Sequence, residues 1–211
     1  MTESIACVFC NGVLSDRKEV LRWARQADLL IGADAGAGHL RSLGLCPHAI
    51  IGDMDSIGED PWQGDATIER VVYPVRKDRS DTELAIEWAI AHGADHVWLF
   101  GANGGRFDHV LGHCALLLRY PGRVAVWEAG FWVQALGAGQ KTEIRTRAGS
   151  VISVFPMSNR PRISLHGMEY NLSEQTLDYA THGLSNSVQQ EDATIEVHEG
   201  VVLACVEGQM V

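Results

Sequence analysis

Two aspartates lie close together directly after an apolar stretch of the chain. Asp53 and Asp55 follow residues 49–52, Ala-Ile-Ile-Gly, with one methionine between them. Carboxylates at this spacing suit Mg²⁺, which binds one or two protein carboxylates together with the oxygens of substrate phosphates. Because glycine, aspartate and serine are also common in turns, the segment by itself leaves a solvated turn as the alternative.

Charges of both signs crowd into the short segment before a predicted helix. Ser80 and Glu83 have the spacing of a capping box, and Asp81 suits the positive end of the helix dipole. A helix cap does not explain the neighbouring Lys77 and Asp78. A phosphate group bound together with a metal ion would use both signs, cations for its oxygens and carboxylates for the metal.

A glycine-rich loop follows a later apolar stretch and precedes another predicted helix. Gly104 and Gly105 would let an anion approach the backbone N–H groups at the start of that helix, and Arg106 adds a guanidinium group. Asp108 either caps the helix or joins the metal site, and His109 follows it directly. The loop therefore predicts phosphate binding.

A fourth segment, rich in small residues, ends the second predicted strand. Residues 32–38 include Asp34 and Gly36 but match neither the Walker A pattern nor G-x-G-x-x-G. They would still let an adenine or a ribose lie close to the backbone. Since all four segments follow predicted strands, we expect them to meet at the carboxyl edge of one sheet, where α/β proteins bind ligands.

Strands and helices alternate in the prediction for residues 1–130. Asn11-Gly12 is a turn signal after the first strand, and Ser15 or Asp16 can cap the first helix. Repeated strand–helix units imply a mostly parallel sheet with helices on its faces. The predicted strands are residues 5–9, 29–33, 49–51, 71–73, 97–100 and 124–127. The predicted helices begin near residues 16, 37, 80 and 107, the last with Phe107, Val110, Leu111, Cys114 and Leu118 on one face.

Residues 131–211 have a different pattern. Short β-rich runs are separated by glycine, serine and asparagine, and no segment has a helical period. This is typical of an all-β sandwich. The predicted strands are residues 131–136, 142–145, 151–155, 162–166, 193–198 and 201–206.

Composition excludes some classes of protein. The formal charge of −10 argues against non-specific binding of nucleic acid, and no run of 18 apolar residues predicts a membrane span. The first residues lack the pattern of a signal peptide, so we expect a cytoplasmic protein with its five cysteines as free thiols. Cys7 and Cys10 form a C-x-x-C inside an apolar stretch, which favours buried thiols over a redox or zinc site.

The motifs together resemble those of the thiamine pyrophosphokinase family, also called thiamine diphosphokinase. Its G-D-x-D-S, K-D-x-T-D and G-G-R-x-D-H signatures are similar to residues 52–56, 77–81 and 104–109, with serine in place of threonine at position 80. Its A-D-G-G-A-N-R-L resembles residues 33–40, although Ala35, Gly38 and His39 differ. In the second half, Gly167, Tyr170, Leu172 and Ser185-Asn186 match further signatures in the same order.

The resemblance implies an enzyme that converts ATP and thiamine into AMP and thiamine diphosphate with Mg²⁺. Residues 1–130 would form an α/β ATP-binding catalytic domain, and residues 131–211 a β-sandwich for thiamine binding and dimerisation. The active site would lie between the subunits of a homodimer. The resemblance assigns metal binding to Asp53, Asp55 and Asp81; catalysis to these with Asp78 and Asp108; ATP binding to Asn11, Asp34, Gly36, Lys77, Ser80, Gly104, Gly105, Arg106 and His109; and thiamine binding to Ser185 and Asn186.

Several alternatives stay open at this point. The acceptor could be another alcohol, such as a hydroxymethyl-pterin, since Val201–Ala204 stands where some family members have a tryptophan against thiamine. The chain could instead bind nucleotide or thiamine without catalysis. The D-x-D of Asp53 and Asp55 also resembles the start of a haloacid-dehalogenase-like phosphatase. The residues leave the general base open between Asp78 and Asp81.

Overall fold

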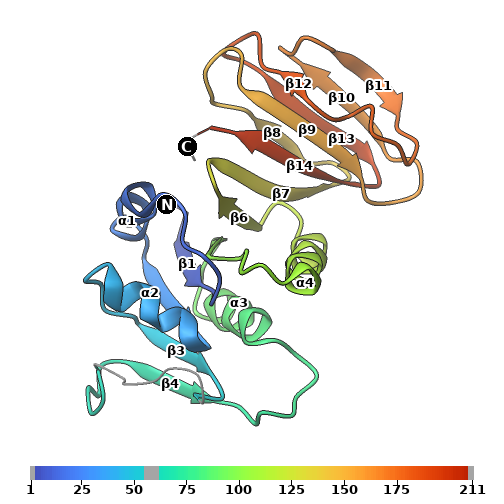
Figure 1. The fold of residues 1–211 in the computed structure, drawn as a ribbon. Helices are drawn as coiled ribbons and strands as arrows, with labels where there is room; N and C mark the ends of the chain where they lie inside the picture. The colour runs from blue at the N-terminus through green and yellow to red at the C-terminus, as the bar shows by residue number, and fades with distance from the viewer. Residues whose placement is uncertain (1–2, 55–61, 209–211) are drawn as a thin grey trace. The chain divides into compact units, whose positions relative to one another are not determined.

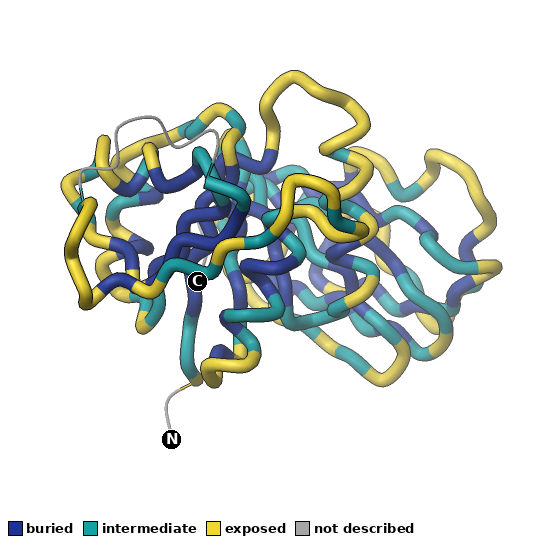
Figure 2. Tube along the Cα trace, turned by 90° about the horizontal axis from the view of Figure 1, so that it is seen from below, coloured by how far each residue is buried: buried dark blue, intermediate teal, exposed yellow. Residues whose placement is uncertain are grey.

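The computed structural model describes residues 3–54 and 62–208 of the chain. The chain divides into two compact units. Unit 1 comprises residues 1–113 and 126–129, and unit 2 comprises residues 114–125 and 130–211. In both units the buried stretches run through the interior and the exposed ones form the surrounding loops (Figure 2). In the described ranges every helix is too short or too polar to span a bilayer.

Unit 1 is built on a parallel sheet with helices against it (Figure 1). Its strands are β1 (Ile5–Phe9), β2 (Leu29–Ala33), β3 (Ala49–Gly52), β4 (Glu69–Val72) and β5 (His96–Phe100). They pair in the order β5-β1-β2-β3-β4, and each of these pairings is parallel. The predicted mostly parallel sheet is confirmed.

The strand order reverses at β1. From β1 the chain builds the sheet outward through β2, β3 and β4, and then returns to place β5 on the other side of β1. Such a reversal leaves a crevice outside the carboxyl ends of the two strands, because their connections diverge to opposite sides. The crevice between β1 and β5 is therefore the expected ligand site of unit 1.

The inner strands of this sheet form because their apolar runs are covered on both faces. Ala6, Cys7, Val8 and Phe9 have no exposed surface, and the rings of Phe9 and Phe100 lie 5.5 Å apart. Burial raises the pKa of the Cys10 thiol to about 11. The C-x-x-C thus consists of buried thiols in the core, which is inconsistent with a redox pair that depends on accessible thiolates.

The helical segments that begin in unit 1 are α1 (Arg17–Ala24), the 3₁₀ turn η1 (Asp34–Gly36), α2 (Ala37–Ser42), α3 (Asp81–Ala91) and α4 (Phe107–Arg119). Two of them, α1 and α3, begin at polar caps that the sequence predicts. The side chain of Asp16 accepts a hydrogen bond from the Glu19 N–H, and that of Ser80 accepts one from the Glu83 N–H. Helix α3 packs against β1, β2 and β3, which fixes the position of its first turn.

Helix α4 departs from the prediction. Phe107 and Leu111 are 73% and 54% exposed, so the face that the sequence assigned to them is not the buried one at the start of this helix. Leu116 and Leu117, in its last turns, are buried. Strand β6 (Val124–Glu128) follows, and its residues Val124–Trp127 are buried as their apolar run predicts.

Unit 2 contains two antiparallel sheets. The first has the order β12-β9-β14-β7 and the second β11-β10-β13-β8. The strands are β7 (Phe131–Gly137), β8 (Lys141–Glu143), β9 (Val151–Pro156), β10 (Arg162–His166), β11 (Leu172–Thr176), β12 (Asn186–Ser187), β13 (Thr194–Glu199) and β14 (Val201–Glu207). The polar β11 and the short β12 were not predicted, because neither has an apolar run.

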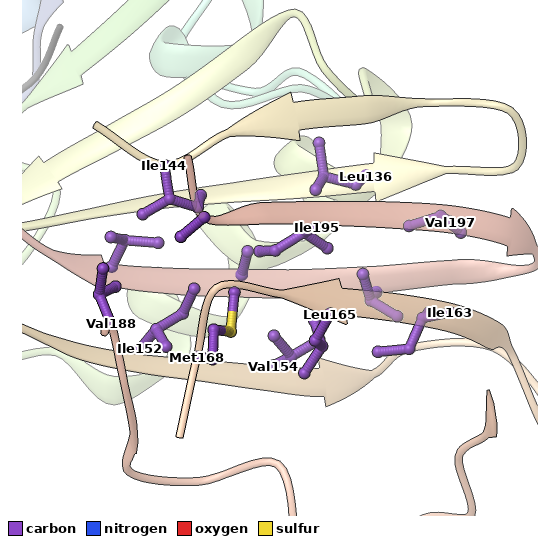
Figure 3. Close-up of a cluster of buried hydrophobic side chains, with 14 of the residues drawn as sticks. Leu136, Ile144, Ile152, Val154, Ile163, Leu165, Met168, Val188, Ile195 and Val197 are labelled. Atoms are coloured by element: carbon purple, nitrogen blue, oxygen red, sulfur yellow. The ribbon is translucent and has the colours of Figure 1, made fainter. Parts of the chain in front are cut away.

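The core of unit 2 lies between its two sheets. Ile152 and Val154 of the first sheet pack in one cluster with Ile163, Ile195 and Val197 of the second (Figure 3). Ile152, Ile163, Ile195 and Val197 have no exposed surface. Contact between the inner faces of two sheets is the defining feature of a sandwich, so the predicted all-β sandwich is confirmed.

In unit 1, a matched pair of glycines tests the packing of η1 against β1. A Cβ atom on Gly36 would lie 1.9 Å from the Phe9 carbonyl oxygen, whereas one on Gly38 would meet nothing within 4 Å. We expect Gly36→Ala to lower the free energy of unfolding by about 1–3 kcal/mol through overpacking. Gly38→Ala, inside α2, should raise it by about 0.5–1 kcal/mol. Urea unfolding of both variants measures the difference, and equal stabilities would contradict the close approach of η1 to β1.

Candidate active site

The loops after β1 and β5 are joined by backbone hydrogen bonds. The Cys10 N–H donates to the Phe100 carbonyl at 2.8 Å, and the Gly12 N–H donates to the Gly101 carbonyl at 2.8 Å. The Val13 N–H donates to Asn103 at 2.7 Å. The pairing of the two strands thus continues beyond their ends, and it fixes both loops at the point where the strand order reverses.

Glycine is required at position 12, where these loops touch, and position 104 leaves little room for a side chain. A Cβ atom on Gly12 would lie 2.3 Å from the Gly101 carbonyl oxygen, and one on Gly104 would lie 3.1 Å from the Gly12 Cα. The same Cβ atom on Gly104 would lie 3.8 Å from the Asn11 carbonyl oxygen. The structure therefore brings Asn11 and Gly104, both predicted from the sequence, next to each other. Because glycine has no side chain, the backbone there is accessible to a ligand.

His39 connects helix α2 to the same loops. Its Nε2 lies 2.8 Å from the Gly12 carbonyl oxygen. A carbonyl oxygen only accepts hydrogen bonds, so the imidazole donates, and Nε2 carries the proton. From the sequence, His39 is noted only as a departure from the family pattern. Its contact with a residue 27 positions earlier has no local signal.

Three aspartates from separate segments lie around Gly52 and Lys77. A Cβ atom on Gly52 would be 2.9 Å from the Asp34 Cβ and 3.2 Å from an Asp81 carboxylate oxygen. The Lys77 Nζ is 3.0 Å from Asp81 and 3.7 Å from Asp53. The carboxyl ends of β2 and β3 and the first turn of α3 thus bring their carboxylates together, as the sequence predicts.

The charge of Lys77 stabilises this arrangement. Its side chain is 14% exposed. Burial acts to lower the pKa of the ammonium group, but Asp81 and Asp53 together outweigh burial and raise the pKa. A cation shared by two carboxylates offsets their mutual repulsion. The same two carboxylates could hold a divalent cation, with Lys77 then directed to an anionic ligand.

The described residues supply two carboxylates that could bind a metal ion. No group of three or more histidine, cysteine, aspartate or glutamate side chains with metal-binding geometry occurs within residues 3–54 and 62–208. Mg²⁺ does not need such a group, because it keeps waters and substrate oxygens as ligands. Asp55, the third predicted ligand, lies outside the described residues. Asp53 and Asp81 fit the requirement for one or two carboxylates.

Two predicted residues of the loop before α3 lie apart from this group. Asp78 is exposed, and in the described part of the chain its carboxylate has no ion pair or hydrogen bond. Ser80 is exposed as well, and its hydroxyl accepts the Glu83 N–H at 3.2 Å as the cap of α3. Both residues are close to Asp81 in the sequence, but in the described residues neither side chain bonds to the carboxylates of Asp34, Asp53 or Asp81.

The glycine-rich loop 104–109 is exposed and ends in an ion pair. The Arg106 guanidinium donates two hydrogen bonds to the Asp108 carboxylate, at 2.6 and 3.2 Å. These hydrogen bonds lower the pKa of Asp108 to about 2. Gly105 has φ of 81°, and its N–H donates to the Asn103 side chain at 3.3 Å. In the described residues Asp108 forms its ion pair with Arg106 and is not part of the group around Lys77. His109 is exposed.

In unit 2 the two residues assigned to thiamine differ in role. Asn186 is 7% exposed, and its amide group bonds the backbone N–H and C=O of Tyr170 at 3.0 and 2.8 Å. Ser185 is exposed, with φ of 56° and its N–H donating to the Ser153 hydroxyl at 3.1 Å. Asn186 therefore holds the surrounding loops together, while Ser185 presents its side chain to solvent.

Comparison with known proteins identifies the family. The sequence model described as "Thiamin pyrophosphokinase, catalytic domain" matches residues 20–126, and that described as "Thiamin pyrophosphokinase, vitamin B1 binding domain" matches residues 141–202. The chain belongs to the thiamine pyrophosphokinase family. The family resemblance in the motifs is confirmed, and with it an enzyme of the kinase and transferase class that acts in thiamine diphosphate biosynthesis.

Individual relatives agree with this assignment. The chain is 29% identical to the thiamine pyrophosphokinase of Bacillus subtilis (strain 168) over 83% of its own length and 85% of the relative's. It is 25% identical to thiamin pyrophosphokinase 1 of Caenorhabditis elegans, covering 82% and 76% of the two chains. These names favour a pyrophosphokinase over the phosphatase and the non-catalytic binding module.

Solved structures have the same fold. The crystal structure of thiamine pyrophosphokinase from Bacillus subtilis superposes with a TM-score of 0.86 over 99% of this chain and all of the other, at 24% identity. That of thiamin pyrophosphokinase from Geobacillus thermodenitrificans gives 0.81 over 97% of each chain, at 26% identity. The family fold thus extends over both units.

The ion pair in the glycine-rich loop leads to a prediction on titration. Because Arg106 stabilises the ionised form, the Asp108 carboxylate should stay charged as the pH falls and protonate near pH 2. Arg106→Gln should move the midpoint up to roughly 4, the range of an unpaired aspartate. Side-chain NMR titration measures the midpoint. The matched control is Arg160→Gln, which removes the partner of Asp178 in unit 2 and should leave Asp108 unchanged. An unaltered midpoint in Arg106→Gln would contradict the assignment.

Proposed function

We propose that this chain transfers a pyrophosphoryl group from ATP to the hydroxyl of thiamine, giving thiamine diphosphate and AMP. The observation that carries the proposal is the meeting of Asp53 and Asp81 at Lys77, with Asp34 against Gly52, at the carboxyl edge of a parallel sheet. Carboxylates for a metal and a cation for phosphates lie there together, next to glycine-rich loops. The family assignment supports the same chemistry.

Mg²⁺ is the metal that we propose for the carboxylates. Asp53 and Asp81 would hold it, with Asp55 as the third predicted ligand. When bound, the ion would offset negative charge on the phosphate oxygens of ATP. Lys77 would turn its ammonium group from the carboxylates to those oxygens, since the metal takes over the neutralisation of Asp53 and Asp81.

The ATP site would lie over the joined loops of β1 and β5. Asn11, Asp34 and Gly36 would lie near the nucleoside, because small residues allow close approach there. The backbone N–H groups of Gly104 and Gly105 would face the phosphates at the start of α4. Arg106 would exchange Asp108 for phosphate oxygens, since the pair is exposed and phosphate oxygens can replace the carboxylate as acceptors. Ser80 and His109 would complete this site.

In the reaction the thiamine hydroxyl oxygen forms a bond to the β-phosphorus of ATP. The bond between that phosphorus and the oxygen bridging to the α-phosphate breaks, and AMP leaves with its electron pair. The hydroxyl proton passes to Asp78 or Asp81. Positioning of the two substrates and fixed charges around the phosphates supply the acceleration, as in other phosphoryl transfers.

Thiamine would be bound by unit 2, with Ser185 in contact with it and Asn186 holding the loop. We propose residues 1–130 as the catalytic domain and residues 131–211 as the thiamine-binding and dimerisation domain. Two chains would form a homodimer with the active site between subunits. Cytoplasmic location stays a prediction from the sequence.

The function is tested by measuring AMP and thiamine diphosphate formed from ATP, Mg²⁺ and thiamine. Omission of thiamine, or its replacement by a hydroxymethyl-pterin, should abolish AMP formation. AMP formed with the pterin but not with thiamine would reassign the acceptor. ATP and thiamine binding without AMP would support the non-catalytic alternative.

In the same assay Asp53→Asn and Asp81→Asn should each lower kcat by about 100-fold or more, the scale for loss of one fixed electrostatic element. The matched control is Asp95→Asn. Asp95 accepts the Ser4 N–H at 2.9 Å before β5, at the opposite edge of the sheet, and should keep turnover within about twofold. Near-normal kcat in both site variants would remove the carboxylate group from the mechanism.

A second prediction separates contact from support in unit 2. Asn186→Ala removes both hydrogen bonds to the partly buried backbone groups of Tyr170 and should lower the free energy of unfolding by about 1–3 kcal/mol. Ser185→Ala should change stability by less than about 0.5 kcal/mol but raise KM for thiamine roughly 2- to 10-fold, the value of one hydrogen bond. Ser173→Ala, on exposed β11, is the control for KM. An unchanged KM in Ser185→Ala would exclude this contact.

A further inference from the structure

Glu128 lies at the end of β6, where the chain makes its last contribution to unit 1. No motif singled it out, and the mechanism above does not use it. It is half-buried, and burial raises the pKa of its carboxyl group above the ordinary value, although hydrogen bonds oppose the change. A partly buried carboxylate with one buried oxygen is costly and needs a structural or functional reason.

The contacts of Glu128 reach both loops of the proposed ATP site. Its carboxylate accepts hydrogen bonds from the Ser15 hydroxyl and from the backbone N–H of Asn103. One carboxylate oxygen of Glu128, Oε2, is buried and has no hydrogen bond among the described residues. The Ser15 hydroxyl oxygen in turn accepts the Ala129 N–H at 2.8 Å.

These bonds fix the start of the glycine-rich loop. The Asn103 N–H is held by Glu128, and its carbonyl oxygen accepts the Val13 N–H at 2.7 Å. The Asn103 side chain also accepts the Gly105 N–H. Asn103 is therefore held through its N–H, its carbonyl and its side chain immediately before two glycines, which have the greatest backbone freedom of any residue.

We propose that Glu128, together with Ser15, is a positioning residue that orders the loop of Gly104 and Gly105 for the phosphates of ATP. The proposal rests on the proposed function, since it assigns that loop to ATP. Ordering the loop before ATP arrives lowers the entropy lost on binding, so affinity rises without a direct contact between Glu128 and the nucleotide. The carboxylate acts through the backbone of Asn103.

The first test compares three variants of the full chain in the AMP assay. Glu128→Ala removes the acceptor and should raise KM for ATP about 10-fold, with KM for thiamine within about twofold. Glu128→Gln keeps one acceptor oxygen on a side chain of the same size and should keep KM for ATP within about threefold of the unaltered chain. The matched control is Glu207→Ala. Glu207 is a partly buried glutamate of unit 2 that accepts the Val151 N–H at 2.9 Å, and its loss should leave KM for ATP unchanged.

The second test measures hydrogen–deuterium exchange of the backbone amides of residues 103–106, which does not require activity. Exchange should speed up about 10-fold or more in Glu128→Ala, and not in Glu128→Gln or Glu207→Ala. Should Glu128→Ala not fold, Ser15→Ala removes one donor of the same cluster and should give a smaller acceleration.

The outcomes separate this proposal from the proposed function. Unchanged exchange in both Glu128→Ala and Ser15→Ala, or equal effects of alanine and glutamine at position 128, would overturn the positioning role even in an active enzyme. An equal rise in KM for ATP in Glu207→Ala would overturn it as well. Absence of AMP formation by the unaltered chain would instead refute the proposed function, while the exchange measurement would still decide whether Glu128 orders the loop.

Discussion

The hydrogen bonds that extend the pairing of β1 and β5 into their loops are the constraint on which the proposed site depends. Loops that follow parallel strands usually diverge, because each leads to a helix on one face of the sheet. Here Gly12 and Val13 stay bonded to Gly101 and Asn103, and glycine at positions 12 and 104 removes the side chains that would separate the backbones. The loops therefore form a fixed surface of peptide groups and not two independent flexible segments.

Local charge decides what such a surface can bind. The chain has a formal charge of −10, and it is nevertheless proposed to bind a polyphosphate. This is consistent because charges separated by more than about 10 Å are largely screened, while contacts within a site are not. Lys77 and Arg106 are both held by carboxylates, which orient them and offset their charge. Under the proposed function, both cations would be released to the phosphates when ATP and a metal bind.

Support and contact are divided between different residues in both units. The side chains of Asn186 and His39 form hydrogen bonds with the backbone of neighbouring loops, whereas Ser185 and Arg106 are exposed. A buried amide or imidazole is costly unless hydrogen-bonded, so residues of the first kind specify one loop conformation. A sequence motif contains both kinds of residue without distinguishing them, so only the structure separates their roles.

The sequence alone determined the mostly parallel α/β half, the β-sandwich half and the segments that follow the strands, because burial imposes a period on apolar residues and turns require particular residue types. It did not determine the polar strand β11, the exposure of Phe107, or the inward direction of Asn186. Strand order, which places β5 beside β1, was decided by the tertiary structure. So were the contact of His39 with Gly12 and that of Glu128 with Asn103. Such contacts join residues distant in the chain, and neither partner carries a local pattern that reports the other.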